Sequence, residues 1–416
     1  MIARLQGLDR QVKQYLLVTF NYWNFTLTDG ALRMLVVLHF HQLGYSPLAI
    51  ASLFLFYEIF GVVTNLVGGY LGARLGLNRT MNVGLALQVV ALGMLAVPAA
   101  YLSVPYVMAA QALSGIAKDL NKMSAKSAIK TLLPRGQEGA LYRWVALLTG
   151  SKNALKGVGF FLGGALLMGL GFRWAMVAMA TVLVVVLLLS LRGLGKDLGR
   201  AKSKPKFSQL FSKSRSINLL SAARLFLFGA RDVWFVIAVP LYLGSVFGWS
   251  HLQVGGFMAA WVIGYGVIQG FAPRLTGTAR AAAQPLERVP DGRSALLWAG
   301  GLTLVTALLA LGVQLQWPPQ PTIVLGLMTF GAVFAINSSL HSFLIVHYAG
   351  EDGVSLDVGF YYMANAMGRL LGTVLSGLVF QLAGLAACLW ISVLFLILAT
   401  LISLWLPRHD AVVAQG

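Results

Sequence analysis

Cysteine, acidic residues and charge in general are scarce in this chain. Cys388 is the single cysteine in 416 residues, which excludes an intramolecular disulfide and a soft-metal site made of several thiolates. Charged residues make up 11% of the chain, whereas an ordinary soluble domain carries about 25%. This scarcity of charge excludes an ordinary soluble enzyme.

Hydrophobic residues are abundant and occur in long runs, at 58% of the chain. A transmembrane helix needs about 20 mostly apolar residues. We therefore predict an all-α integral membrane protein with twelve transmembrane helices at approximately 15–43, 47–72, 80–99, 104–133, 139–169, 172–194, 217–246, 251–274, 294–315, 321–349, 355–384 and 385–406. The polar and basic stretch from Met1 to Gln14 precedes a long hydrophobic segment that lacks a small-residue cleavage site, so we expect an uncleaved cytoplasmic start.

The loop charges predict the orientation of these helices. Basic residues gather before the first predicted span and in the loops after the second, fourth, sixth and eighth spans: Arg4, Arg10, Lys13, Arg74, Arg79, Arg135, 192–215 and 274–293. Arg173 is the exception in the opposite loops. The positive-inside rule then places both termini in the cytoplasm (N-in/C-in) of a cell membrane.

Internal repetition divides the chain into two pseudo-symmetric six-helix halves, 1–194 and 217–416, joined by a basic cytoplasmic linker at 195–216. The triplet Gly159, Gly164 and Gly171 recurs as Gly372, Gly377 and Gly384, with Lys156 and Arg369 three residues before each, and Gly44-Tyr-Ser recurs as Gly248-Trp-Ser. A duplicated unit explains these matches. Close helix packing is the alternative reading of the glycines themselves.

The net charge of +18 includes basic residues inside the predicted spans: Arg33, Lys118, Lys122, Lys126, Lys152, Lys156, Arg224, Arg231 and Arg369. Each would cost about 2.5–3.5 kcal/mol if it faced hydrocarbon. Lys118, Lys122, Lys126 and Lys130 recur every fourth residue and lie along one face of a helix. We predict an anion-binding cavity; lysines held neutral, or solvated by a wide vestibule, are the alternative.

Four acids accompany these cations, namely Asp29, Glu58, Asp119 and Asp232. Asp29 precedes Arg33 by one helical turn and could pair with it. Asp119 lies beside the lysines, whereas Asp232 is expected to find its partner on another span. Glu58 has no mate in its own helix, so it is either a structural acid or a carrier of a coupling proton.

Motifs for catalysis, metals or cofactors do not occur in the sequence. The pairs His39/His41 and His341/His347 lack the spacing of helical metal ligands, and phosphate-cradling loops and hydrolase elbows are missing. We therefore expect no enzyme activity, no cofactor, no metal and no nucleic-acid partner. Tyr361, Tyr362 and Asn365 either bind an anion together with Arg369 or pack the helices.

The segment GGYLGARLGLNR, from Gly68 to Arg79, resembles the loop motif of the major facilitator superfamily, although Ala73 stands where that family has an acid. Four further stretches, 25–47, 111–130, 142–166 and 360–373, resemble the organoarsenical efflux permeases of bacterial arsenic-resistance operons, the ArsJ family. This resemblance covers nearly the whole chain and is weakest at 275–320 and at the C-terminus.

The resemblance implies a monomeric transporter in the bacterial inner membrane that exports 1-arseno-3-phosphoglycerate. A partner glyceraldehyde-3-phosphate dehydrogenase would make this substrate by using arsenate. The expected binding residues are Arg33, Lys118, Lys122, Lys126, Lys152, Lys156, Arg231, Asn365 and Arg369. Two rival functions are an antiporter for another phosphorylated anion or phosphate, and a receptor or scaffold that binds an anion without moving it.

Overall fold

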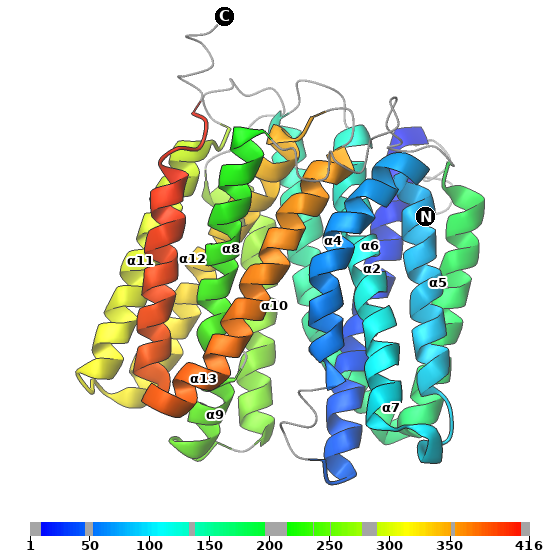
Figure 1. Ribbon diagram of the computed structural model, residues 1–416, viewed down its shortest axis with the longest axis horizontal. Coiled ribbons are helices and arrows are strands. Elements are labelled where there is room, and N and C mark those ends of the chain that lie inside the picture. The colour runs from blue at the N-terminus through cyan, green and yellow to red at the C-terminus, as the bar shows by residue number, and fades with distance from the viewer. Residues whose placement is uncertain are drawn as a thin grey trace, which may run out of the picture. The chain divides into compact units, whose positions relative to one another are not determined.

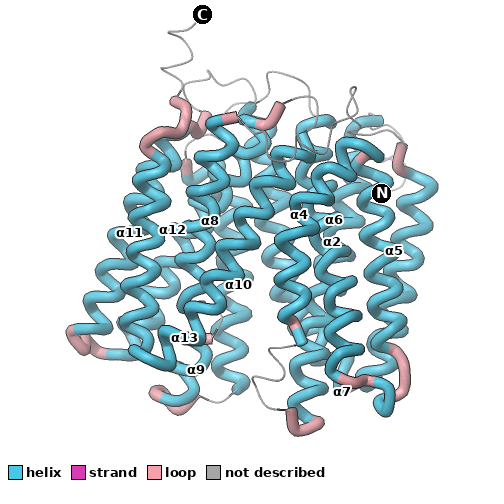
Figure 2. The backbone as a smooth tube through the Cα atoms, in the orientation of Figure 1, coloured by secondary structure: helices cyan, strands magenta, loops and turns pink. Residues whose placement is uncertain are grey.

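The computed structural model describes residues 10–45, 53–132, 138–195, 214–235, 237–249, 251–276, 289–350 and 354–408. Helices and short connections make up this part of the chain, with no strand in it (Figure 2). The α-helices, labelled in Figure 1, are α2 Arg10–Gln42, α4 Leu55–Leu75, α5 Leu77–Leu95, α6 Val104–Leu132, α7 Glu138–Gly193, α8 Arg215–Phe235, α9 Ala238–Ser245, α10 His251–Leu275, α11 Gly292–Gln314, α12 Pro319–Tyr348 and α13 Val354–Ser403. The all-α prediction is confirmed for the described residues.

Two long helices are interrupted by glycines that the repeat analysis singled out. Gly171 has φ 71° and ψ 170° inside α7, and Gly384 has φ 74° and ψ −171° inside α13. Because only glycine adopts this backbone region readily, the chain turns there and starts a new helical segment. Both breaks fall at predicted span boundaries, and the corresponding glycines Gly44 and Gly248 also have positive φ, at 83° and 66°.

Gly171→Ala is expected to lower the free energy of unfolding by about 1–3 kcal/mol, because alanine is strained at this φ and ψ. Gly164→Ala is the matched control, since a Cβ at Gly164 in the same helix would have no heavy atom within 4 Å. Thermal unfolding in detergent measures both variants. Equal stability of Gly171→Ala and the wild type would contradict the assignment of strain to this position.

Six described helical stretches are long and apolar enough to cross a membrane: Leu55–Leu75, Gly139–Gly193, Arg215–Ser245, Gly292–Gln314, Pro319–Tyr348 and Val354–Ser403. Large apolar side chains are exposed along them, for example Met168 at 90% and Leu382 at 75%. Such exposure fits a surface covered by lipid. Helix α6 is not among these stretches, because its lysines and Asp119 lower its mean hydropathy.

The chain forms two compact units that do not follow the sequence order strictly. Unit 1 takes in Met1–Arg135, Leu155–Ser212 and Ala349–Met363. Within it, α6 packs against α2, α4 and α5. Buried polar side chains join three of its helices, because Asn21 of α2 donates to the Ser190 hydroxyl of α7 at 2.8 Å and Ser190 donates to Asn82 of α5 at 2.5 Å.

Unit 2 takes in Gly136–Ala154, Lys213–Tyr348 and Ala364–Gly416. Its helix α12 packs against α8, α10 and α11. An aromatic core lies among these helices, in which Trp234 packs edge-on against Phe330 and Trp261 stacks on Tyr265, with ring centroids 4.9 and 5.6 Å apart. Most of the predicted linker at 195–216 and most of the N-terminal segment Met1–Gln14 lie outside the described residues.

Candidate functional site

The lysines of α6 point toward aromatic rings within unit 1. Lys118 Nζ lies 3.7 Å from the ring centroid of Tyr57 on α4. Lys122 and Lys126 Nζ lie 4.6 and 5.3 Å from the ring centroid of Tyr362, at the beginning of α13. The regular spacing along α6 thus produces a row of ammonium groups, each of which gains cation–π stabilisation from a tyrosine face. The side chain of Lys130 is outside the described part of the structure.

Asp119 holds two of these lysines by charge. Its carboxylate, which is 1% exposed, accepts a hydrogen bond of 2.6 Å from Lys122 and lies 3.9 Å from the Lys118 ammonium. Lys122 and Lys118 remain 12% and 16% exposed. One buried acid therefore serves two cations whose side chains remain partly exposed.

A second arrangement in unit 1 joins α2 to α4. Arg33 forms an ion pair of 3.1 Å with Glu58, and its guanidinium lies 5.1 and 4.8 Å from the rings of Phe54 and Tyr57. Asp29 accepts a 2.7 Å hydrogen bond from the Tyr57 hydroxyl. The structure thus gives Glu58, which has no mate in its own helix, a partner on α2.

Lys152 and Lys156 lie one helical turn apart in α7 but fall in different compact units. Lys156 belongs to unit 1, where its backbone packs closely on Gly30 of α2 and its Nζ lies 6.0 Å from the Phe160 ring. Half-buried Lys152 belongs to unit 2, where the neighbouring Asn153 donates to Gln269 of α10.

In unit 2, Asp232 is the acid between two arginines. The carboxylate is 2% exposed and pairs with Arg231 at 2.5 Å and with Arg369 of α13 at 3.4 Å. The expectation that its partner would come from another helix holds for Arg369. It is wrong in leaving out Arg231, because the flexible arginine side chain bends back to its sequence neighbour despite the 100° turn between them.

Arg224 is the deepest cation of unit 2, at 3% exposed. Its Nε donates to the Asn365 side chain at 2.9 Å, a second nitrogen donates to the Ser338 carbonyl at 3.3 Å, and its guanidinium stacks 3.8 Å from the Phe228 ring. Asn365 therefore orients an arginine on α8. The sequence left two roles open for Asn365, anion binding together with Arg369 or helix packing, and the structure adds this contact with Arg224.

Basic residues outnumber acids among the helix-interior charges of both units. Unit 1 has Arg33, Lys118, Lys122, Lys126 and Lys156 with Asp29, Glu58 and Asp119, and unit 2 has Lys152, Arg224, Arg231 and Arg369 with Asp232. Like charges brought together in a low dielectric repel strongly. An anion entering among them would relieve this repulsion, and arginine and lysine are the residues best suited to phosphate-like oxygens.

Sequence reasoning missed two contributors to the site. Tyr57 lies under both Arg33 and Lys118, and Arg224 was counted among the buried cations without being placed in the binding set. The sequence feature that could have indicated Tyr57 is its position as an aromatic residue next to Glu58, within a predicted span. Among the described residues, no group of three or more His, Cys, Asp or Glu side chains could hold a metal ion.

Comparisons with known proteins agree on the class of the chain. The family profile described as Major Facilitator Superfamily matches residues 15–286. No curated protein sequence matches the chain.

Among solved structures, the human organic anion transporter MFSD10 (TETRAN) superposes with a TM-score of 0.71 at 17% identity, covering 95% of this chain and 100% of its own. A bacterial homologue of the iron transporter ferroportin in an outward-facing state gives 0.73 at 13% identity, covering 95% and 99%. The E. coli fucose:proton symporter FucP gives 0.71 at 11% identity, covering 96% and 100%. At these identities the likeness concerns the fold alone.

The profile match spans well over half of the 416 residues and agrees with the all-helical fold and its apolar spans. Members of this family are multi-pass membrane transporters and not enzymes. The chain therefore belongs to the major facilitator superfamily.

Proposed function

We propose that the chain exports a small, multiply charged organic anion, 1-arseno-3-phosphoglycerate, and thereby gives resistance to arsenate. The observation that carries this proposal is the excess of basic side chains inside both units, with partly accessible Lys118, Lys122, Arg231 and Arg369. A cargo with both a phosphate and an arsenate group carries several negative charges, which basic side chains would balance. The specific cargo rests on the resemblance to the ArsJ family.

The proposed mechanism is alternating access, in which six-helix halves 1–194 and 217–416 rock about a site near the membrane midplane. The side chains proposed to bind the cargo are Arg33, Lys118, Lys122, Lys126 and Lys156 of unit 1 and Lys152, Arg231 and Arg369 of unit 2. Asn365 orients Arg224 in unit 2. Export of an anion from a cell that is negative inside is electrically downhill, so the pairing of Glu58 with Arg33 fits a structural acid rather than an obligatory proton carrier.

A second candidate, exchange of phosphate or another phosphorylated metabolite, uses the same cations. MFSD10, which shares the fold, is described as an organic anion transporter, a class that includes phosphorylated metabolites and the proposed organoarsenical but not inorganic phosphate. We propose twelve spans with both termini in the cytoplasm for either function. The breaks at Gly171 and Gly384, which divide α7 and α13, support this count.

Everted membrane vesicles that contain the chain test the proposed cargo. Because the acyl arsenate is short-lived, it is made outside the vesicles by a glyceraldehyde-3-phosphate dehydrogenase supplied with its substrate, arsenate and NAD. We expect arsenic to accumulate inside only when the whole mixture is present, and not when NAD is left out. Uptake that is equal without NAD, or phosphate uptake that the complete mixture does not inhibit, would favour the second candidate.

A further inference from the structure

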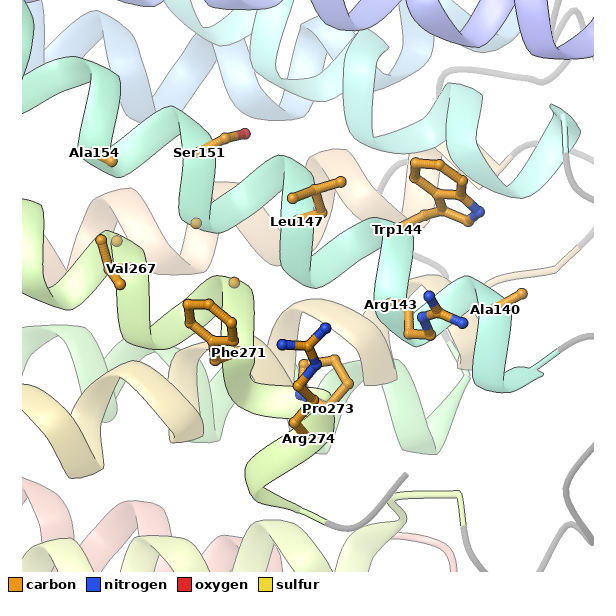
Figure 3. Close-up of a pocket in the computed structure, with 13 residues that line it drawn as sticks. Ala140, Arg143, Trp144, Leu147, Ser151, Ala154, Val267, Phe271, Pro273 and Arg274 are labelled. Atoms are coloured by element: carbon orange, nitrogen blue, oxygen red, sulfur yellow. The ribbon is translucent and has the colours of Figure 1, made fainter. Parts of the chain in front are cut away.

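A pocket of about 550 Å³ lies within unit 2, between the first part of α7 and the last part of α10. Figure 3 shows that it is basic at one end and apolar along its length. Arg143 and Arg274 lie at the basic end, while Leu147 and Phe271 line its middle and Val267 lies toward the far end. None of the cations assigned to cargo binding lines this pocket.

The sequence positions explain the two different ends. Arg143 is near the beginning of α7 and Arg274 is in the last turn of α10, so antiparallel packing brings the two arginines to the same end. At the other end small residues let the helices approach, since a Cβ at Gly150 would lie 2.5 Å from the Gly266 carbonyl oxygen. The hollow therefore lies between a basic rim and a closely packed base.

Both arginines are available to a ligand. Their side chains are exposed, and of the carboxylates whose side chains are described, none forms an ion pair with either one. Arg274 stacks 5.3 Å from the ring of Phe271, which holds its guanidinium over the pocket. Two adjacent guanidinium groups are well suited to bind a phosphodiester.

The apolar side chains of the pocket indicate which class of phosphate-containing ligand it binds. Leu147, Val267 and Phe271 are 46%, 47% and 49% exposed, and Trp144 beside Arg143 is 37% exposed. In a membrane protein these faces contact acyl chains, and tryptophan is favoured at the level of lipid headgroups. An inorganic phosphate or a sugar phosphate has no apolar group that could contact these side chains.

We infer that this pocket binds an anionic glycerophospholipid, with its phosphate between Arg143 and Arg274 and one acyl chain along Leu147, Phe271 and Val267. Basic pockets between transmembrane helices bind anionic headgroups in this way. The predicted orientation assigns the lipid to the cytoplasmic leaflet. None of the proposed transport cations lines this pocket, so the test of lipid binding can fail without contradicting the proposed cargo.

Native mass spectrometry of the full chain in detergent, titrated with phosphatidylglycerol or phosphatidylcholine, tests the site. We expect the wild type to retain phosphatidylglycerol preferentially. Arg143→Gln should lower its affinity about five-fold, and the double variant with Arg274→Gln about 25-fold. Arg192→Gln is the matched control, because Arg192 is an exposed arginine in the last turn of α7 outside the pocket.

Gly270→Leu tests the apolar part without touching the charges. A Cβ at Gly270 would have no heavy atom within 4 Å, so leucine can enter the hollow and exclude an acyl chain. Loss of bound lipid in this variant, with an unchanged unfolding temperature, is the expected result. Equal retention of both lipids, full retention by the double arginine variant, or displacement of the lipid by millimolar inorganic phosphate would each overturn the inference.

Discussion

Lys122→Ala is expected to lower transport about 10- to 100-fold, which is the effect of losing a charge-assisted contact to an anionic cargo. Lys122 is bound to Asp119 at 2.6 Å and stacked on Tyr362, and its side chain remains 12% exposed. Arg369→Ala should have a similar effect from unit 2. The arsenic that accumulates in everted vesicles measures both, with the amount of membrane-inserted protein determined alongside.

A second variant separates cargo binding from simple neutralisation of Asp119. If Lys122 only balances the buried carboxylate, the double variant Asp119→Asn/Lys122→Ala should regain transport, because it removes both charges. If Lys122 binds the cargo, the double variant stays inactive, whereas Lys122→Arg keeps part of the activity. Wild-type transport by Lys122→Ala and Arg369→Ala alike would refute the assigned site.

Asp232→Asn is expected to lower the free energy of unfolding by about 3–5 kcal/mol, the usual cost of removing one partner of a buried charge pair. The 2% exposed carboxylate serves both Arg231 and Arg369, so its loss leaves two guanidinium groups in the protein interior without their acid. Thermal unfolding of the purified variant in detergent measures this effect.

A compensating change shows whether charge is the cause. Arg231→Gln/Asp232→Asn should recover part of the stability, since it removes one of the two cations that the carboxylate had balanced. Asp29→Asn serves as a control, because an amide oxygen still accepts the hydrogen bond from Tyr57. A stability of Asp232→Asn equal to that of the wild type would mean that other groups neutralise the two arginines.

The parts of the fold that were predictable are those set by local rules. Long apolar runs give helices in a membrane, and a glycine at a matched position of each half allows the sharp breaks at Gly171 and Gly384. The assignment of 138–154 to unit 2 and of 354–363 to unit 1 was not predictable, because it depends on contacts far apart in the sequence. For example, the Ser355 hydroxyl donates to the Gly69 carbonyl at 2.8 Å.

For the site, helical periodicity correctly placed Lys122 and Lys126 on one face, where both contact Tyr362. Periodicity within one helix could not predict which residues pair between helices. Proximity on α2 suggested Asp29 for Arg33, yet the structure pairs Arg33 with Glu58, 25 residues away, because α4 packs alongside. Side-chain flexibility is the other limit, as the bent pairing of Arg231 with Asp232 shows.

The solitary Cys388 has a practical consequence for following the protein at work. Its thiol is buried, at 0% exposed, against the aromatic core of unit 2. Because thiol reagents require an accessible thiolate, we expect the native chain to react very little with a thiol label. A cysteine introduced at Leu147 would then report, through protection from a maleimide, whether lipid occupies the pocket, without prior removal of native thiols.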